Sequence, residues 1–202
     1  MQKLLNEWRQ YLAETDADSP SLTYSQRAVN LIKAFEHFSA EPYDDKCNYT
    51  KLKGGKIGPK PKRKKCGGTA TIGYGTTVYP NGKAVALEDK TINLQQAETY
   101  LKNSLNYIIA GINKYMGIEG KVYKKGPNKG KPIILNQNQI DALASLGFNI
   151  GRQSLLSSEV YSLATRDPDN PKIRQLFMQW QSDPGHQKRR EAEADLYFTP
   201  IA

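Results

Sequence analysis

The sequence predicts an α+β fold in which a small β-containing lobe and a larger helical lobe enclose a cleft. Two observations predict it. Over residues 69–78, β-formers alternate with glycines, as in short strands joined by tight turns. From Asn93 onward, apolar residues instead recur every three to four positions, as on helices that bury one face. A chain of 202 residues is long enough to give such a two-lobed domain a core.

The first 22 residues are predicted to form an N-terminal helix and a linker, and the domain itself is expected to span residues 23–202. Residues 2–14 carry apolar side chains at helical spacing, and residues 15–23 have the composition of a linker. Because the start of the chain lacks the continuous apolar core of a signal peptide, we expect synthesis in the cytoplasm without one. No stretch approaches the roughly 20 apolar residues of a spanning helix, so we expect no membrane insertion.

A helix is predicted over residues 24–36, followed by turns. Its buried stripe is expected to be Val29, Ile32 and Phe35. Pro42 and the adjacent Asp44 and Asp45 are expected to break the chain into turns. A further turn is predicted over residues 79–83, which contain a Pro-Asn-Gly sequence.

Five helices are predicted after the β region. The first begins after Asn93, where Gln96 completes a capping box. Its apolar stripe is Leu94, Ala97, Leu101, Leu105, Ile108 and Ile112. The second begins at Asn136 and ends at Gly151. Three shorter helices are expected over residues 158–164, 171–181 and 186–198.

The positive charge of the chain is concentrated in one segment. Lys and Arg number 29 against 20 Asp and Glu, and nine of the basic residues lie between Lys46 and Lys65, where there is no acid. Such a segment favours a polyanion, either nucleic acid, anionic lipid or a bacterial wall polymer. The alternative is a solvated loop that keeps the protein in solution. Because Tyr49 is the segment's one aromatic residue, base stacking is poor and we expect no nucleic-acid partner.

The two cysteines, Cys47 and Cys66, bracket this segment at a separation of 19 positions. A disulfide across a loop of that size would stabilise the fold by roughly 3 kcal/mol and would imply an oxidising compartment. Two free thiols are the alternative. His37 and His186 lack ligand spacing relative to the cysteines, so we expect no metal and no other cofactor.

Three polar residues become a pattern when residues 46–65 are set aside as an insertion. Eight residues then separate Glu36 from Asp45, and five separate Asp45 from Thr71, which leads into Ile-Gly-Tyr-Gly. This pattern resembles the phage-type lysozymes, the endolysins of glycoside hydrolase family 24. Residues 141–151 (DALASLGFNIG) and 189–197 (RREAEADLY) resemble two further blocks of that family, in the family's order. The basic insertion, counted with its cysteines, covers residues 46–66.

The resemblance implies a lysozyme-like fold and an N-acetylmuramidase that hydrolyses the β-1,4 bond between N-acetylmuramic acid and N-acetylglucosamine in peptidoglycan. Glu36 would be the general acid, a role that apolar surroundings favour. Asp45 would stay ionised, stabilise positive charge at the anomeric carbon and orient a water, and Thr71 would hold that water. This arrangement implies inversion, with the two carboxyl groups about 6.5–9.5 Å apart.

The resemblance also implies substrate contacts and partners. Phe148 would supply an apolar wall and Asn149 an amide for the acetamido groups, with Ser158 and Thr77 as weaker candidates. Many family members carry His at the position of Thr76, and we expect that change to cost a structural ion pair and not catalysis. A non-catalytic module that binds peptidoglycan remains the alternative.

The expected site of action is the periplasm or cell wall, reached by a monomer. Release by a phage holin or injection as a secretion-system toxin would bring the chain there, and the second route would add an immunity protein as a partner. The segment between Lys46 and Lys65 would contact an anionic wall polymer.

Overall fold

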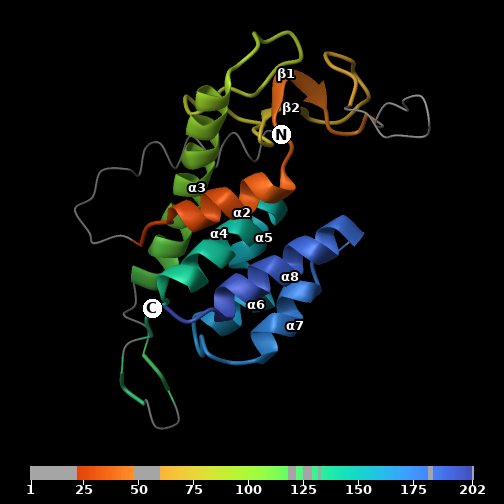
Figure 1. Cartoon of the computed structure of the whole chain (residues 1–202). Helices are drawn as coiled ribbons and strands as arrows, with labels where there is room; N and C mark the ends of the chain where they lie inside the picture. Colours follow the sequence, from red (N-terminus) through yellow and green to blue (C-terminus); the bar gives the residue numbers. More distant parts are fainter. Residues whose placement is uncertain are drawn as a thin grey trace. The chain divides into compact units, whose positions relative to one another are not determined.

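The computed structural model describes residues 22–47, 60–117, 122–124, 129–131, 133–181 and 184–201 (Figure 1). They form two compact units. Among the described residues, the first unit holds Glu36–Ser104, and the second holds residues 22–35 together with Leu105 and all that follows it. The helix expected over residues 2–14 lies outside the described residues, as do residues 48–59 of the basic insertion.

The first unit contains an antiparallel pair of strands, β1 (Ser39–Asp44) and β2 (Ala70–Gly73). From the Ser39–Gly73 pair to the Tyr43–Thr71 pair, β1 advances four residues while β2 advances two. Strand β1 therefore bulges, and a bulged strand bends.

Pro42 lies in the irregular part of β1, where the absence of an N–H group costs no regular ladder bond. Its carbonyl accepts a hydrogen bond from the Arg63 N–H at 2.9 Å. The sequence prediction that Pro42 breaks the chain into turns was therefore wrong, because the bulge and this bond accommodate a proline inside the strand.

The chain turns sharply after β2. Ile72 and Thr76 exchange two backbone hydrogen bonds of 2.9 Å each, and the turn between them contains Gly73 and Gly75 at φ +66° and +98°. Residues other than glycine rarely adopt such angles. The predicted tight turn is therefore confirmed.

Helix α3 (Leu94–Gly117) begins at the predicted capping box. The Asn93 and Gln96 side chains each accept the other residue's backbone N–H, at 2.8 and 2.9 Å. The predicted stripe is buried except for Leu94, which is 59% exposed. Ile92, directly before the cap, is buried instead, at the position of a hydrophobic staple. The helix contributes its residues up to Ser104 to the first unit and the remainder to the second.

The second unit is helical, and its centre is α4 (Gln137–Ile150), whose residues 138–147 are all buried. Helix α4 packs against α2 (Gln26–Phe35), α5 (Arg152–Leu156) and α8 (Pro184–Phe198) (Figure 1). The remaining helices are α6 (Glu159–Ala164) and α7 (Lys172–Met178). The start of α4 at Asn136 and its end at Gly151, where φ is +89°, are as predicted.

Helix α2 is shorter than predicted at both ends. It starts at Gln26 because the Ser25 hydroxyl accepts the Arg27 N–H at 3.1 Å, as an N-cap does. The Ser25 hydroxyl and N–H both donate to the Asp141 carboxylate of α4, which ties the two helices together. Of the predicted stripe, Val29 and Ile32 are fully buried, whereas Phe35, in the last turn, is half-buried.

The predicted α+β class is confirmed: the antiparallel strands lie in the first unit and the packed helices in the second. Helix α5 has no counterpart among the predicted helices, because five residues are too few to show a period. Among the described residues, no helix has the length and the apolar character that crossing a membrane would require.

Candidate active site

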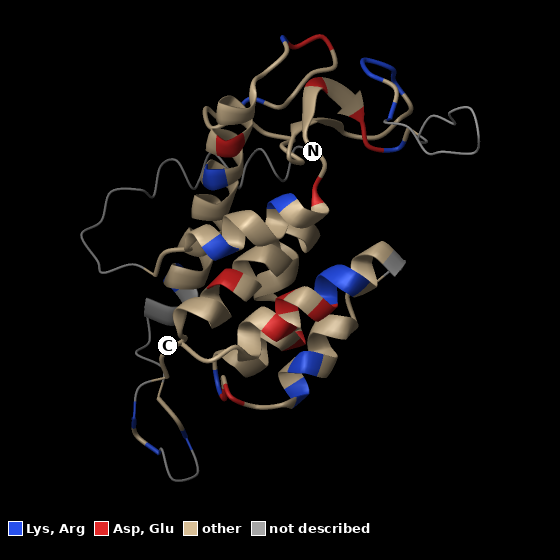
Figure 2. Cartoon of the chain, in the orientation of Figure 1, with Lys and Arg blue, Asp and Glu red and all other residues tan. Residues whose placement is uncertain are grey.

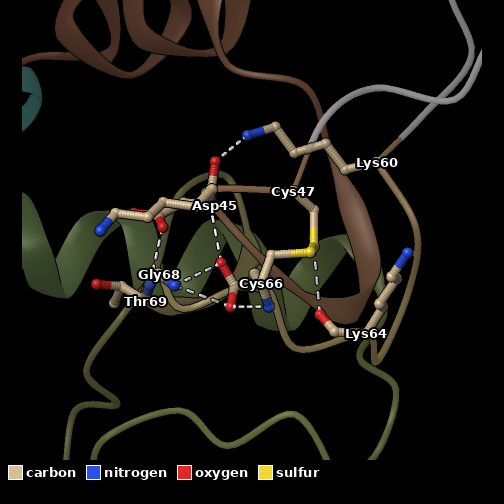
Figure 3. Close-up of a disulfide and its surroundings, with 9 residues drawn as sticks. Asp45, Cys47, Lys60, Lys64, Cys66, Gly68 and Thr69 are labelled. Atoms are coloured by element: carbon tan, nitrogen blue, oxygen red, sulfur yellow. Dashed lines mark hydrogen bonds between the residues drawn. A yellow bond between two sulfur atoms is a disulfide. The ribbon is translucent and has the colours of Figure 1, made fainter.

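Two of the three predicted catalytic residues, Asp45 and Thr71, bond to Thr69, and Figure 3 shows the contact of Asp45. The Asp45 N–H donates to the Thr69 carbonyl at 3.0 Å, and the Thr69 N–H donates to Asp45 Oδ1 at 2.7 Å. The Thr71 hydroxyl donates to the same Thr69 carbonyl at 3.1 Å. Asp45 is exposed and Thr71 is buried. Because the Thr71 hydroxyl proton is engaged, its oxygen is an acceptor toward any further partner.

Glu36 lies at the other end of β1. It is half-buried and directly follows Phe35, the last residue of α2. Three residues later β1 begins at Ser39, whereas Asp45 follows the last residue of that strand. The bulge of β1 lies between the two residues, and a bulge bends the strand that carries it.

Asp44, next to Asp45, is buried at 2% exposure. From the sequence it was predicted only as part of a turn. Its Oδ1 accepts the N–H groups of Lys46 and Gly68 at 3.0 and 2.9 Å. Its Oδ2 accepts those of Cys66 and Gly68 at 2.7 and 3.0 Å. A single carboxylate therefore joins the turn after β1 to the segment that leads into β2 (Figure 3).

The Asp44 carboxyl group is held in its ionised form. Desolvation by burial raises its pKa, but the backbone hydrogen bonds of Cys66, Gly68, Lys46 and Gly67 together lower it further. The net result is a pKa below the ordinary value of 3.8. Backbone N–H groups lower the pKa of a carboxyl group because they bond more strongly to the charged form than to the protonated form.

Gly68 is required by the two neighbouring carboxylates. A Cβ atom at this position would overlap the Oδ1 atoms of both Asp45 and Asp44 and would lie 2.8 Å from the Lys46 nitrogen. These are polar atoms that are fixed by hydrogen bonds, so they cannot move aside without breaking them. The adjacent glycines after Cys66 and the doubled aspartate were the sequence signals for this cluster.

Cys47 and Cys66 form the expected disulfide, with their Cα atoms 5.2 Å apart (Figure 3). Cys47 is buried and Cys66 is exposed. Because Cys66 also donates its N–H to Asp44, the covalent link and the carboxylate hold the same end of the basic insertion.

Three basic residues at the end of the insertion bond to the first unit, in the stretch beside β1 that Figure 2 colours blue. Lys60 Nζ bonds to the Asp45 carbonyl, and Lys62 Nζ donates to the Ser39 hydroxyl at 2.5 Å. Arg63 pairs with Glu41 at 3.5 Å.

Tyr43, on β1, lies beneath this part of the insertion. The ammonium groups of Lys60 and Lys62 lie 6.0 and 5.3 Å from its ring centroid. Desolvation lowers the pKa of Lys62, although the nearby Glu41 carboxylate raises it. The insertion thus supports β1, a role that the charge pattern alone did not predict. Lys64 and Lys65 are exposed.

The four residues predicted to contact the substrate lie in different parts of the fold. Phe148 and Asn149 are half-buried in the last turn of α4. Thr77 is half-buried in the first unit. Ser158 is 5% exposed and caps α6: its hydroxyl donates to the Leu155 carbonyl at 2.6 Å and accepts the Tyr161 N–H at 3.1 Å. A substrate contact at Ser158 is therefore not supported by its position.

Metal ligands do not gather at the site or elsewhere in the described part of the chain, where no group of three His, Cys, Asp or Glu residues could hold an ion. The chemistry that the described residues offer is that of carboxylates and a hydroxyl group.

The family model described as phage lysozyme matches residues 33–193, which include Glu36, Asp45 and Thr71. The chain belongs to the phage lysozyme family. Two curated relatives are endolysins: that of Bacillus phage B103 is 25% identical over 186 residues, and that of Salmonella phage P22 is 33% identical over 93 residues. These matches cover 88% and 46% of this family member, but only 55% and 53% of the relatives, so the chain spans about half the length of each.

Solved structures of similar fold cover nearly the whole of this family member. The endolysin of Escherichia coli O157:H7 phage FAHEc1 superposes with a TM-score of 0.62 at 24% identity, over 88% of this chain and 94% of that one. The muramidase domain of SpmX from Asticaccaulis excentricus gives 0.59 at 22% identity, over 88% and 99%. At these identities the likeness shows the fold.

Proposed function

We propose that the chain is an N-acetylmuramidase that hydrolyses the β-1,4 bond between N-acetylmuramic acid and N-acetylglucosamine in peptidoglycan. Family membership supports the proposal. The observation that carries it is the convergence of Asp45 and Thr71 on the Thr69 carbonyl, because it sets a carboxylate beside a hydroxyl acceptor as hydrolysis by a held water requires.

In this mechanism Glu36 is the general acid and protonates the leaving oxygen. Asp45 uses Oδ1 to accept the Thr69 N–H, and its Oδ2 takes one proton from the water as the water oxygen bonds to the anomeric carbon. Thr71, whose proton is engaged, accepts the second proton of that water. A water that donates to both residues directs its lone pairs away from them, toward the anomeric carbon, while the Asp45 charge stabilises the developing positive charge.

The mechanism inverts the configuration at the anomeric carbon, because the water and the leaving group occupy opposite faces of the sugar. The first product from a β-linked chain is then the α-anomer. Proton NMR of a soluble wall oligomer during hydrolysis measures this directly. A β-anomer as the first product would exclude a water-based single displacement.

The decisive experiment is mass spectrometry of purified sacculi digested with the wild type and with Glu36→Gln. We expect reducing muramic acid ends from the wild type and a loss of at least about 100-fold in their rate of release from the variant, since general acid catalysis contributes about 10²–10⁴-fold. Glu98→Gln is the matched control, because Glu98 lies on α3 in a half-buried ion pair with Lys102 at 2.9 Å. It should retain wild-type activity.

Other outcomes of the digest would contradict the proposal. Anhydro-muramic acid ends would indicate a lytic transglycosylase, and cleaved stem peptides would indicate a peptidase. Sacculi that bind the chain but release nothing would indicate a binding module without turnover. Undiminished activity of Glu36→Gln would remove Glu36 from the acid role.

The exposed residues Lys64 and Lys65 contact anionic wall polymer in this proposal. Lys60, Lys62 and Arg63 hold β1 and are less available to a partner. The double variant Lys64→Ala/Lys65→Ala should bind sacculi more weakly at low salt and equally at high salt, because exposed charges are screened. Equal binding at low salt would remove this contact.

Phe148, Asn149 and Thr77 contact the sugar chain in this proposal, and Asn149→Ala should raise KM more than it lowers kcat.

The chain acts as a monomer on the cell wall after release or injection. An immunity protein accompanies it only in the second case. Light scattering of the purified chain and co-purification from the producing cell test these two points.

A further inference from the structure

We propose that Asp44 is a positioning residue for the reaction, one that fixes Asp45 through the main chain. This inference rests on the proposed function of Asp45. Asp44 lies in the first unit, and its carboxylate collects the N–H groups of Lys46, Cys66 and Gly68.

The contacts of Asp44 reach Asp45 from two directions. The Lys46 N–H belongs to the peptide group directly after Asp45, so this bond sets the main chain on the C-terminal side of Asp45. The Gly68 N–H lies one residue before Thr69, whose own N–H bonds Asp45 Oδ1 at 2.7 Å. Asp44 therefore fixes both the chain that carries the Asp45 side chain and the donor that orients its carboxylate.

Burial makes this arrangement rigid. Asp44 is 2% exposed, so water competes poorly for its oxygens. The close contact between Asp44 and Gly68 leaves no room for a side chain on residue 68. An error of about 1 Å in the position of a catalytic group costs on the order of 10²-fold in rate, which sets the scale of the effect.

Asp44→Asn is the test variant, because it keeps the shape of the side chain and one acceptor oxygen. The side-chain NH₂ group of the asparagine must face either the Cys66 N–H or the Lys46 N–H. Both of these are donors, so one hydrogen bond of the turn is lost. We expect kcat on a soluble wall oligomer to fall by about 10–100-fold with little change in KM, measured at a temperature where circular dichroism shows the variant folded.

Asp141→Asn is the matched control. Asp141 is also fully buried, and its carboxylate accepts the Ser25 N–H at 2.7 Å and a Gln137 amide N–H at 2.9 Å. This variant should lose stability and keep the wild-type kcat. A kcat for Asp44→Asn that equals the wild-type value, or a loss matched by Asp141→Asn, would show that Asp44 only stabilises the fold and would overturn the proposal.

A second measurement needs no variant at position 44. The wild type is reduced so that the disulfide between Cys47 and Cys66 opens, and the exchange of the Lys46 and Gly68 amide protons is followed together with kcat. If Asp44 fixes the turn, both amides stay protected and kcat is retained. If reduction releases the amides and lowers kcat by tenfold or more, the disulfide holds Asp45 and the proposal fails.

The two proposals fail in different ways. A wild-type chain that releases nothing from sacculi overturns the muramidase assignment and, with it, the role of Asp44. An active wild type with an equally active Asp44→Asn overturns only the positioning role.

Discussion

Two buried carboxylates, one in each unit, have partners of opposite kinds. Asp44 in the first unit accepts only backbone N–H groups, from residues that lie outside regular elements or at their ends. Glu193 in the second unit accepts from side chains through its Oε1: the Ser145 hydroxyl at 2.7 Å, and Arg189 and Arg190 at 3.1 and 3.0 Å. Both carboxylates are nearly or fully inaccessible to solvent.

The difference shows what each carboxylate stabilises. Glu193 connects α8 with α4, two helices that hydrophobic packing already specifies. Asp44 lies among turns with few apolar residues to pack, so its hydrogen bonds themselves define the chain path. We therefore expect changes near Asp44 to alter the site geometry and activity, and comparable changes in the second unit to alter stability alone.

The largest effect is expected from adding a methyl group at Gly68. Gly68→Ala forces the new Cβ against the carboxylates of Asp44 and Asp45, so their hydrogen bonds must break. We expect kcat to fall by about 10²-fold or more, together with a loss of stability. Kinetics on a soluble wall oligomer and thermal unfolding measure both.

Gly111→Ala is the counterpart in the second unit. There the new Cβ would lie 2.7 Å from the Cδ atom of Arg152, whose guanidinium stacks on Tyr107, and 3.1 Å from a Leu156 methyl group. These side chains must shift, which offsets the preference of about 1 kcal/mol for alanine over glycine in a helix, so stability should fall and kcat should stay the same. If Gly111→Ala lowers kcat as much as Gly68→Ala does, changes in the second unit also alter the site, and the contrast between the two units fails.

A smaller effect is expected from removing the disulfide. The double variant Cys47→Ser/Cys66→Ser frees a loop with a sequence separation of 19, which should cost about 3 kcal/mol of unfolding free energy. Because the main-chain N–H of residue 66 still donates to Asp44 in this variant, kcat at low temperature should stay within about twofold of the wild type. Urea unfolding and initial rates test both parts.

The opposite pattern would contradict this comparison. Unchanged unfolding would mean that the disulfide adds nothing to the stability of the first unit. A large loss of kcat with intact folding would mean that the covalent bond, and not the carboxylate, holds the turn.

The helices could be predicted from the sequence because their determinants are local. Asn93 with Gln96, and the period of Ala97, Leu101 and Leu105, fix the start and the buried face of α3 within a few residues. The one exposed member of the stripe, Leu94, was predicted wrongly because the hydrophobic position next to the cap is taken by Ile92.

The turn that carries Asp45 could be predicted only in part. The spacing of Glu36, Asp45 and Thr71 pointed to a site, and the structure joins Asp45 to Thr71 through Thr69. The role of Asp44 was missed because its partners are N–H groups as far as 24 positions away, and the doubled aspartate and the adjacent glycines do not show by themselves which groups bond. The bulge of β1 was missed for the same reason, since pairing across strands fixes it.

The smallest expected effect is a change of stability in acid. The pKa of Asp44 is below its ordinary value of 3.8, so the ionised carboxylate is favoured by the fold and not by the unfolded chain. Its contribution is fully present above that ordinary value and is lost as the pH falls through the lower pKa of the folded state. Protonated aspartic acid and asparagine resemble each other. The unfolding free energy of the wild type should therefore exceed that of Asp44→Asn by a constant amount above about pH 5, and the two values should converge below pH 3.8.

Asp141→Asn, measured in parallel, is the control variant in the second unit. A difference between wild type and Asp44→Asn that does not change with pH would show that the charge of Asp44 contributes nothing, and that its shape alone holds the turn.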